Sequence, residues 1–67
     1  MPSRVIRAYE YDALSRELIV TFVTGRRYAY EGVPTEVFAW LSSARSKGVY
    51  FNRFIRDAYA FRELPAA

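Results

Sequence analysis

The sequence predicts an α+β domain in which a three-stranded antiparallel β-meander is followed by two short α-helices packed on one face of the sheet (order βββαα). Two patterns support this prediction. The first half of the chain alternates β-branched and aromatic side chains, as strands do, and the second half repeats apolar residues at helical spacing. The 67 residues suit a single domain over residues 1–67. Because so small a core is thin, the aromatic share of 18% is interpreted first as core filling.

The first strand is expected over residues 5–12, which are rich in β-branched and aromatic side chains. In a regular strand Ile6 and Ala8 would face away from Tyr9 and Tyr11, because successive side chains alternate between the two faces. A β-bulge would instead bring Ile6 and Tyr11 to the same side. The sequence leaves both arrangements open.

Short turns connect the three strands. Asp12 is expected to cap the first turn, residues 13–16, through a side-chain hydrogen bond to the backbone. The second strand alternates over residues 18–23, and Gly25 follows in a turn that favours a positive φ. The third strand is expected over residues 26–31. Connections this short favour an antiparallel meander.

Two amphipathic helices are expected in the second half. Pro34 suits the first helical position, Glu36 suits the positive end of the helix dipole, and Gly48 separates the helices, with Ser46 or Gly48 near the start of the second. Pro65 should close the chain. The apolar stripe of the first helix consists of Val37, Trp40, Leu41 and Ala44. That of the second consists of Phe51, Phe54, Ile55, Ala58 and Tyr59.

If both helices cover one face of the sheet, the other face is open or is a contact surface. An open apolar face would suit a protein partner or a second copy of the chain. Some of the following side chains would then be exposed: Val5, Tyr9, Ile19, Val23 and Ala29.

The composition narrows the function classes. The chain has no Cys and no His, which excludes disulfides, the common zinc and copper sites, Cys nucleophiles and His bases, so neither a metal nor a cofactor is expected. Glu10 and Asp12 share a strand face, but no catalytic motif surrounds them, and we expect no enzyme activity. No apolar run has the length of a membrane helix and no signal-peptide pattern is present, which favours a cytoplasmic location. The net charge of +3 permits a polyanionic partner.

Two neighbouring pairs of residues are candidates for nucleic-acid binding. Tyr28 and Tyr30 share one face of the third strand and could stack on unpaired bases. Their alternation also matches the core pattern, which would place them under the first helix. Arg26 and Arg27 beside the Gly25 turn could contact phosphate, or could form a solvated hairpin tip.

The start of the second helix is a further candidate. Ser46-Lys47-Gly48 combines a hydroxyl, a cation and free backbone N–H groups, which together could bind an anion. The alternative is an N-cap and interhelical turn, with Asn52 bonded to local backbone. The candidate basic strip in this part of the chain comprises Arg45, Ser46, Lys47, Asn52, Arg53 and Arg56.

The order of these residues resembles the KTSC domain family, named for a domain at the C-terminus of some lysyl-tRNA synthetases. The resemblance covers about residues 3–61. The segments that carry it are Ile6, Tyr11-Asp12, Leu18-x-Val20-x-Phe22-x-x-Gly25, Tyr28-x-Tyr30-x-x-Val33-Pro34, Leu41-x-x-Ala44-x-Ser46-x-Gly48-x-x-Phe51-Asn52-x-x-Ile55 and Tyr59. The resemblance implies a small domain that occurs on a tRNA-handling enzyme and as stand-alone bacterial or phage-like proteins, with RNA binding as the suggested role.

Two functions follow as expectations. The first is a module that binds RNA, either tRNA or a single strand, through phosphate contacts, with Tyr28 or Tyr30 stacking on bases if exposed. The cations that would make these contacts are Arg26, Arg27, Arg45, Lys47, Arg53 and Arg56. The second is a protein-interaction or homo-oligomerisation domain that uses the open sheet face and terminal aromatics such as Phe61. Convergence of the basic side chains on one face would favour the first, and a contiguous exposed apolar patch would favour the second. A concave pocket with convergent polar groups would favour a small-molecule site.

Overall fold

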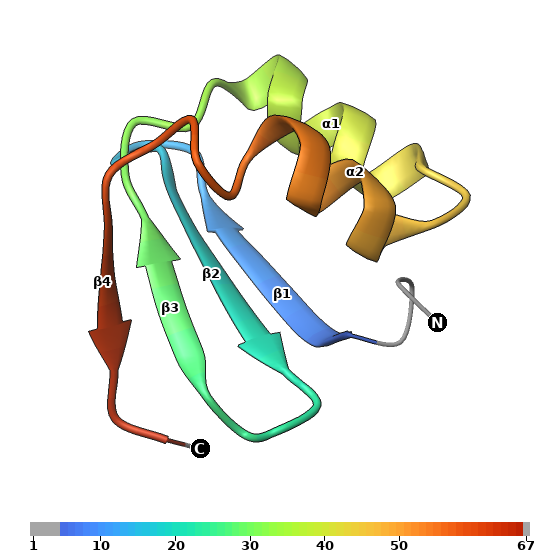
Figure 1. Ribbon diagram of the computed structural model, residues 1–67. Helices are drawn as coiled ribbons and strands as arrows, with labels where there is room; N and C mark the ends of the chain where they lie inside the picture. The colour runs from blue at the N-terminus through green and yellow to red at the C-terminus, as the bar shows by residue number, and fades with distance from the viewer. Residues whose placement is uncertain (1–4, 67) are drawn as a thin grey trace.

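The computed structural model describes residues 5–66, which form one antiparallel sheet with two helices on one of its faces (Figure 1). The predicted meander and helix pair are confirmed, and a fourth strand is added after the helices. The elements in chain order are β1 (Ile6–Asp12), β2 (Glu17–Phe22), β3 (Arg27–Tyr30), α1 (Thr35–Ser43), α2 (Lys47–Phe54) and β4 (Phe61–Leu64), and the strands lie in the order β1-β2-β3-β4. Within residues 5–66 no helix is long and apolar enough to cross a membrane.

β1 contains the bulge that the sequence left open. Ile6 lies opposite Phe22, and the register then slips at Arg7, the residue between Ile6 and the next paired position. Beyond the slip, Tyr9 and Tyr11 point to the same face as Ile6, and all three pack against the core. Tyr9 therefore does not belong to the open face.

The core lies between the sheet and the two helices. Tyr30 is buried and Tyr28 is half-buried on the helix-covered face, so the core interpretation of Tyr30 is confirmed. The cover comes from α2 and not from the first helix, because the ring centroid of Phe51 lies 5.1 Å from that of Tyr30. The buried cluster consists of Leu18, Val20, Tyr30, Val33, Leu41, Phe51 and Ile55.

Local backbone features agree with most of the turn and cap predictions. The amide of Leu14 donates to Asp12 Oδ1 at 3.0 Å, and Gly25 has a φ of 92°. Ser46 is the N-cap of α2, and its hydroxyl accepts a hydrogen bond from the amide of Val49 at 3.2 Å. Pro34 occupies the N-cap of α1 and not the first helical position.

The second helix is shorter than its apolar stripe suggested. α2 ends at Phe54, and residues 55–58 form turns that still bury Ile55. The chain then pairs with the free edge of β3, which satisfies backbone groups there, and β4 stops before Pro65, which has no N–H to continue a ladder. Edge pairing by tertiary structure therefore overrides the helical spacing of the last residues.

The outer face of the sheet is polar where an apolar surface was expected. Arg62 reaches across it, with Nη2 2.7 Å from Glu17 Oε2 and Nη1 2.9 Å from Glu31 Oε2. Ala29 is buried on this face and Ile19 is half-buried. The apolar surface expected for a partner is thus largely absent from this face, and the exposed Val5 and Val23 lie at the end of the sheet beside the β2–β3 turn.

The tyrosines of β1 give a matched test of the core. Tyr11 stacks on Phe38 with centroids 4.5 Å apart, and its hydroxyl donates to the Val33 carbonyl at 2.6 Å. Tyr11→Phe keeps the ring but removes this donor, so we expect the free energy of unfolding in urea to fall by about 1–2 kcal/mol. Tyr9→Phe is the control, because the Tyr9 ring also meets Phe38, at 5.9 Å, and its hydroxyl donates to no other described residue. Equal losses in the two variants would contradict the account.

The N-cap of α2 gives a second test. Ser46→Ala removes the acceptor of the Val49 amide, and we expect a loss of about 1 kcal/mol in the free energy of unfolding. Ser46→Asp keeps an acceptor at the same place and should restore the stability. Urea denaturation followed by circular dichroism measures both variants, and an Ala variant as stable as the wild type would show that the cap contributes nothing.

Candidate binding groove

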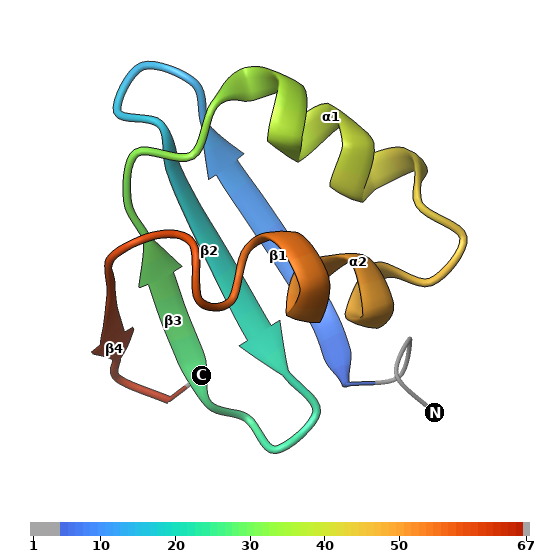
Figure 2. The ribbon, with the colours of Figure 1, turned by 45° about the horizontal axis from the view of Figure 1, so that its top comes forward.

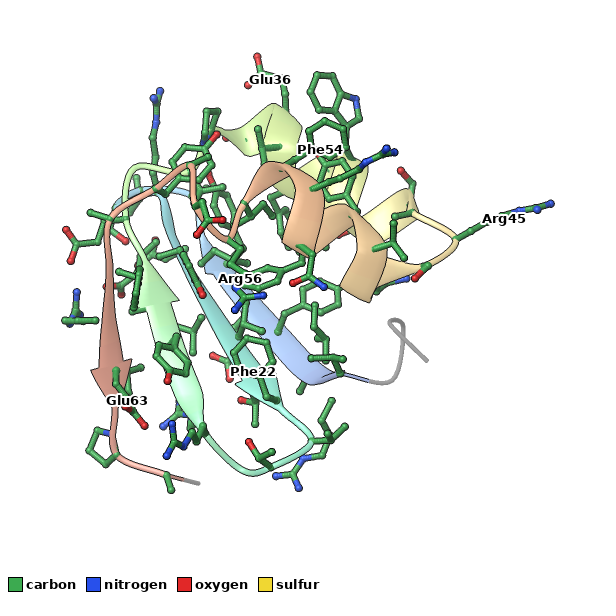
Figure 3. All side chains as sticks on the ribbon, viewed as in Figure 1. Phe22, Glu36, Arg45, Phe54, Arg56 and Glu63 are labelled. Carbon is green, nitrogen blue, oxygen red and sulfur yellow. The ribbon has the colours of Figure 1, made fainter. Side chains whose placement is uncertain are left out.

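A groove opens on the helix-covered face, beside the end of α2 and towards β3 and β4. In Figure 2 the two helices lie over the β1 side of the sheet, and the segment after α2 crosses towards β4. The groove encloses about 480 Å³ and is lined by the β2–β3 turn, the C-terminal end of α2 and β4. Figure 3 shows Arg56 descending from the end of α2 on the side where Phe22 lies.

Aromatic rings form the floor and one wall of the groove. Phe51 is buried in the core. Its ring packs edge-on against Phe22 and against Tyr30, with ring centroids 5.5 Å and 5.1 Å apart. Phe61 on β4 meets Tyr28 at 5.7 Å and is 55% exposed. The buried rings pack against the half-buried Tyr28, which contacts the exposed Phe61, so the groove has an apolar surface that is open to solvent.

Polar side chains also line the groove. Asn52 lies on α2 next to the buried Phe51, and Arg56 lies in the turn that follows the helix, where its backbone amide donates to the Phe51 carbonyl at 2.9 Å. Asn52 is exposed, and its amide makes no hydrogen bond with any other residue in the described range 5–66, so the predicted bond to local backbone is absent. The amide therefore has both a donor and an acceptor available to a ligand.

Arg26 and Arg56 differ in whether a carboxylate forms an ion pair with the guanidinium. Arg26 Nε lies 4.0 Å from Glu63 Oε2, and the neighbouring Tyr28 hydroxyl together with the charge of Glu63 raises the pKa of Arg26. Within the described part of the chain, Arg56 forms no such ion pair. Arg56 is therefore the groove cation with the most charge left for an anionic ligand.

The pKa of the Tyr30 hydroxyl depends on its burial and on neighbouring groups of the groove. Burial raises the pKa of Tyr30, and the neighbouring Tyr28 and Asp57 raise it further, whereas Arg56 lowers it. The phenol therefore stays protonated at neutral pH and can act as a hydrogen-bond donor at the floor of the groove.

The structure brings half of the predicted nucleic-acid-binding residues together. Those that line the groove are Arg26, Tyr28, Tyr30, Asn52 and Arg56. They come from the β2–β3 turn, from β3, and from α2 with the residues just after it, so their proximity results from packing and not from sequence spacing.

The other half lies elsewhere. Arg27 alternates with Tyr28 and so faces the outer side of the sheet, and Arg45 extends from the far end of the α1–α2 loop (Figure 3). Ser46 is occupied as the helix cap, and Lys47 Nζ donates to the Ala44 carbonyl at 3.4 Å. Arg53 is exposed on the side of α2 opposite the core. The ten residues therefore do not form one continuous strip.

Two aromatic residues of the groove are not among the residues that the sequence predicts for nucleic-acid binding. Phe22 packs against the core and also lines the groove, and Phe61 is predicted from the sequence only as a terminal aromatic for protein contact. The available signal was the recurrence of aromatic-x-aromatic in Tyr59-Ala60-Phe61, the same pattern that marks Tyr28 and Tyr30 in β3. Only Phe61 of this triplet lies in β4, so the pattern marks the aromatic residue but does not by itself predict the strand.

The comparisons with known proteins agree with the fold. The chain is 37% identical over 59 residues to a lysine–tRNA ligase of Nostoc sp., covering 88% of this chain and 10% of the ligase. It is 36% identical over 59 residues to an uncharacterized protein of Stutzerimonas stutzeri, covering 88% of this chain and 83% of that protein. The crystal structure of a KTSC domain protein from Yersinia pestis superposes with a TM-score of 0.87 at 32% identity, covering 90% of this chain and 84% of that one.

The chain thus spans about a tenth of the length of the tRNA ligases that it matches and most of the length of the small relatives. The model of the KTSC domain matches residues 2–59, which include the whole of β1 to α2 and end just before β4. The protein belongs to the KTSC domain family.

Proposed function

We propose that the protein is a non-catalytic binding module that takes single-stranded RNA in the groove. The observation that carries the proposal is the meeting of the exposed Phe61 ring and the half-buried Tyr28 ring with Arg56 and Arg26 in one concave site. Stacking of a base on an aromatic side chain contributes about 1–3 kcal/mol, and a guanidinium can bind a phosphate through two hydrogen bonds. The groove offers both kinds of contact within the reach of one short RNA segment.

The relatives support RNA as the class of ligand. Several proteins that match this chain are named lysine–tRNA ligases, and the matched part is about a tenth of their length. A segment of that size on a tRNA-handling protein is a reasonable place for an accessory RNA contact. Of the cations predicted to bind RNA, only Arg26 and Arg56 line the groove. The proposal is therefore limited to these two cations, because the others lie on other surfaces.

A protein-binding role is the second candidate. Its support is the exposure of Trp40 and Phe54 on the two helices, at 59% and 53%. Aromatic residues are enriched where proteins bind one another. This candidate predicts that binding depends on the helices and not on the groove.

Charge-matched variants test the groove. Arg56→Gln should weaken binding of a fluorescein-labelled single-stranded RNA about tenfold in an anisotropy titration, because it removes a charge-assisted phosphate contact. Arg53→Gln and Arg45→Gln remove the same charge outside the groove and should bind as the wild type does. If Arg45→Gln and Arg53→Gln weaken binding as much as Arg56→Gln, the basic-strip hypothesis is correct and the groove is not the site.

A further inference from the structure

We infer that the groove holds one unpaired nucleotide of the RNA strand, with its base against Phe61 and Asn52 and its phosphate at Arg56. This inference rests on the proposed function and adds the size and orientation of what the groove accepts. Three features of the groove support it, namely its volume, its number of free cations and the placement of its ring and amide surfaces.

The volume limits the ligand. The groove encloses about 480 Å³, within the range of about 300–1,000 Å³ of pockets that hold drug-sized ligands. A nucleotide is a ligand of this size, and a run of several nucleotides is not. A longer strand must therefore leave the groove on either side of the bound nucleotide.

The charges limit the number of phosphates. Arg56 faces the groove without a salt-bridge partner in the described residues, whereas Arg26 has Glu63 at 4.0 Å. Arg27 and Arg45 lie on other surfaces. Asp57 also lines the groove, so the cations of the groove suffice for no more than one or two phosphates. The logarithm of the binding constant should therefore fall with the logarithm of the salt concentration at a slope of only about −0.7 to −1.4, since each phosphate contributes about −0.7 for a single strand.

The ring of Phe61 and the amide of Asn52 determine the orientation of the base. Phe61 presents a ring that is 55% exposed and is held by Tyr28 and Tyr30, with centroids 5.7 Å and 5.5 Å away. Asn52, which also lines the groove, carries an amide with a free donor and a free acceptor, which matches the paired donor and acceptor on the edge of a base. In the inferred complex the face of the base stacks on Phe61 and its edge bonds to Asn52.

A length series tests the inference. We would titrate ¹⁵N-labelled protein with uridine, uridine monophosphate, and uridine oligonucleotides of two, four and eight units, at low and at moderate salt. We expect amide shifts at Phe22, Tyr28, Asn52 and Phe61 for the monophosphate and weaker binding of uridine. Affinity should level off beyond the dinucleotide, and the salt slope should stay small.

A pair of phenylalanine variants tests the stacking surface. Phe61→Leu keeps an apolar side chain on β4 but removes the ring, and we expect about a tenfold loss of monophosphate and oligonucleotide affinity. Phe54→Leu is the control, because Phe54 has nearly the same exposure, 53%, and lies on the opposite side of α2 from Arg56 (Figure 3). The dispersion of the amide spectrum shows that both variants are folded.

The outcomes separate this inference from the function it rests on. If affinity climbs steadily with length and falls steeply with salt, and the shifts gather at Arg45 and Arg53, RNA binding stands but the one-nucleotide groove is wrong. If Phe61→Leu binds as tightly as the wild type, the base does not lie on that ring and the inference is overturned. If no RNA or nucleotide shifts any amide at low salt, both proposals fail.

Discussion

The packing of Phe51 against Phe22 and Tyr30 is the interaction on which the rest of the structure depends. Phe51 is 2% exposed, and it joins α2 to both central strands of the sheet. In a chain of 67 residues with no cysteine, this aromatic contact takes the place of the disulfide or metal that many domains of this size need. The same rings then continue outward through Tyr28 to Phe61, so the core and the groove floor are one cluster.

The groove follows from the shortness of α2. Because the helix ends at Phe54, the chain has to cross the sheet to reach the free edge of β3, and the space beside that crossing is left open. The residues that follow the helix end supply Arg56, and the strand that completes the sheet supplies Phe61. Arg56 and Phe61 are therefore brought together by the pairing of β4 with β3, and no local sequence motif contains both residues.

Local sequence patterns predicted those elements whose structure depends on residues close together in the chain. The alternation of β2 and β3, the Asp12 turn, the Gly25 turn and the Ser46 cap all depend on near neighbours in the chain. β4 was missed because apolar residues up to Tyr59 also fit a helix, and only pairing with β3 decides between the two. The groove could be predicted only in part, since Tyr28, Tyr30 and Asn52 were identified as candidates but their approach to Phe61 requires the fourth strand.

The central claim is that the outer part of the aromatic cluster binds an RNA base. Intermolecular NOEs between uridine monophosphate and protein labelled with ¹³C in its Phe and Tyr rings test this claim most directly. The account predicts cross-peaks from the uracil protons to the rings of Phe61 and Tyr28, and none to Phe54. Cross-peaks to Phe54, or saturated binding without a cross-peak to any groove ring, would contradict it.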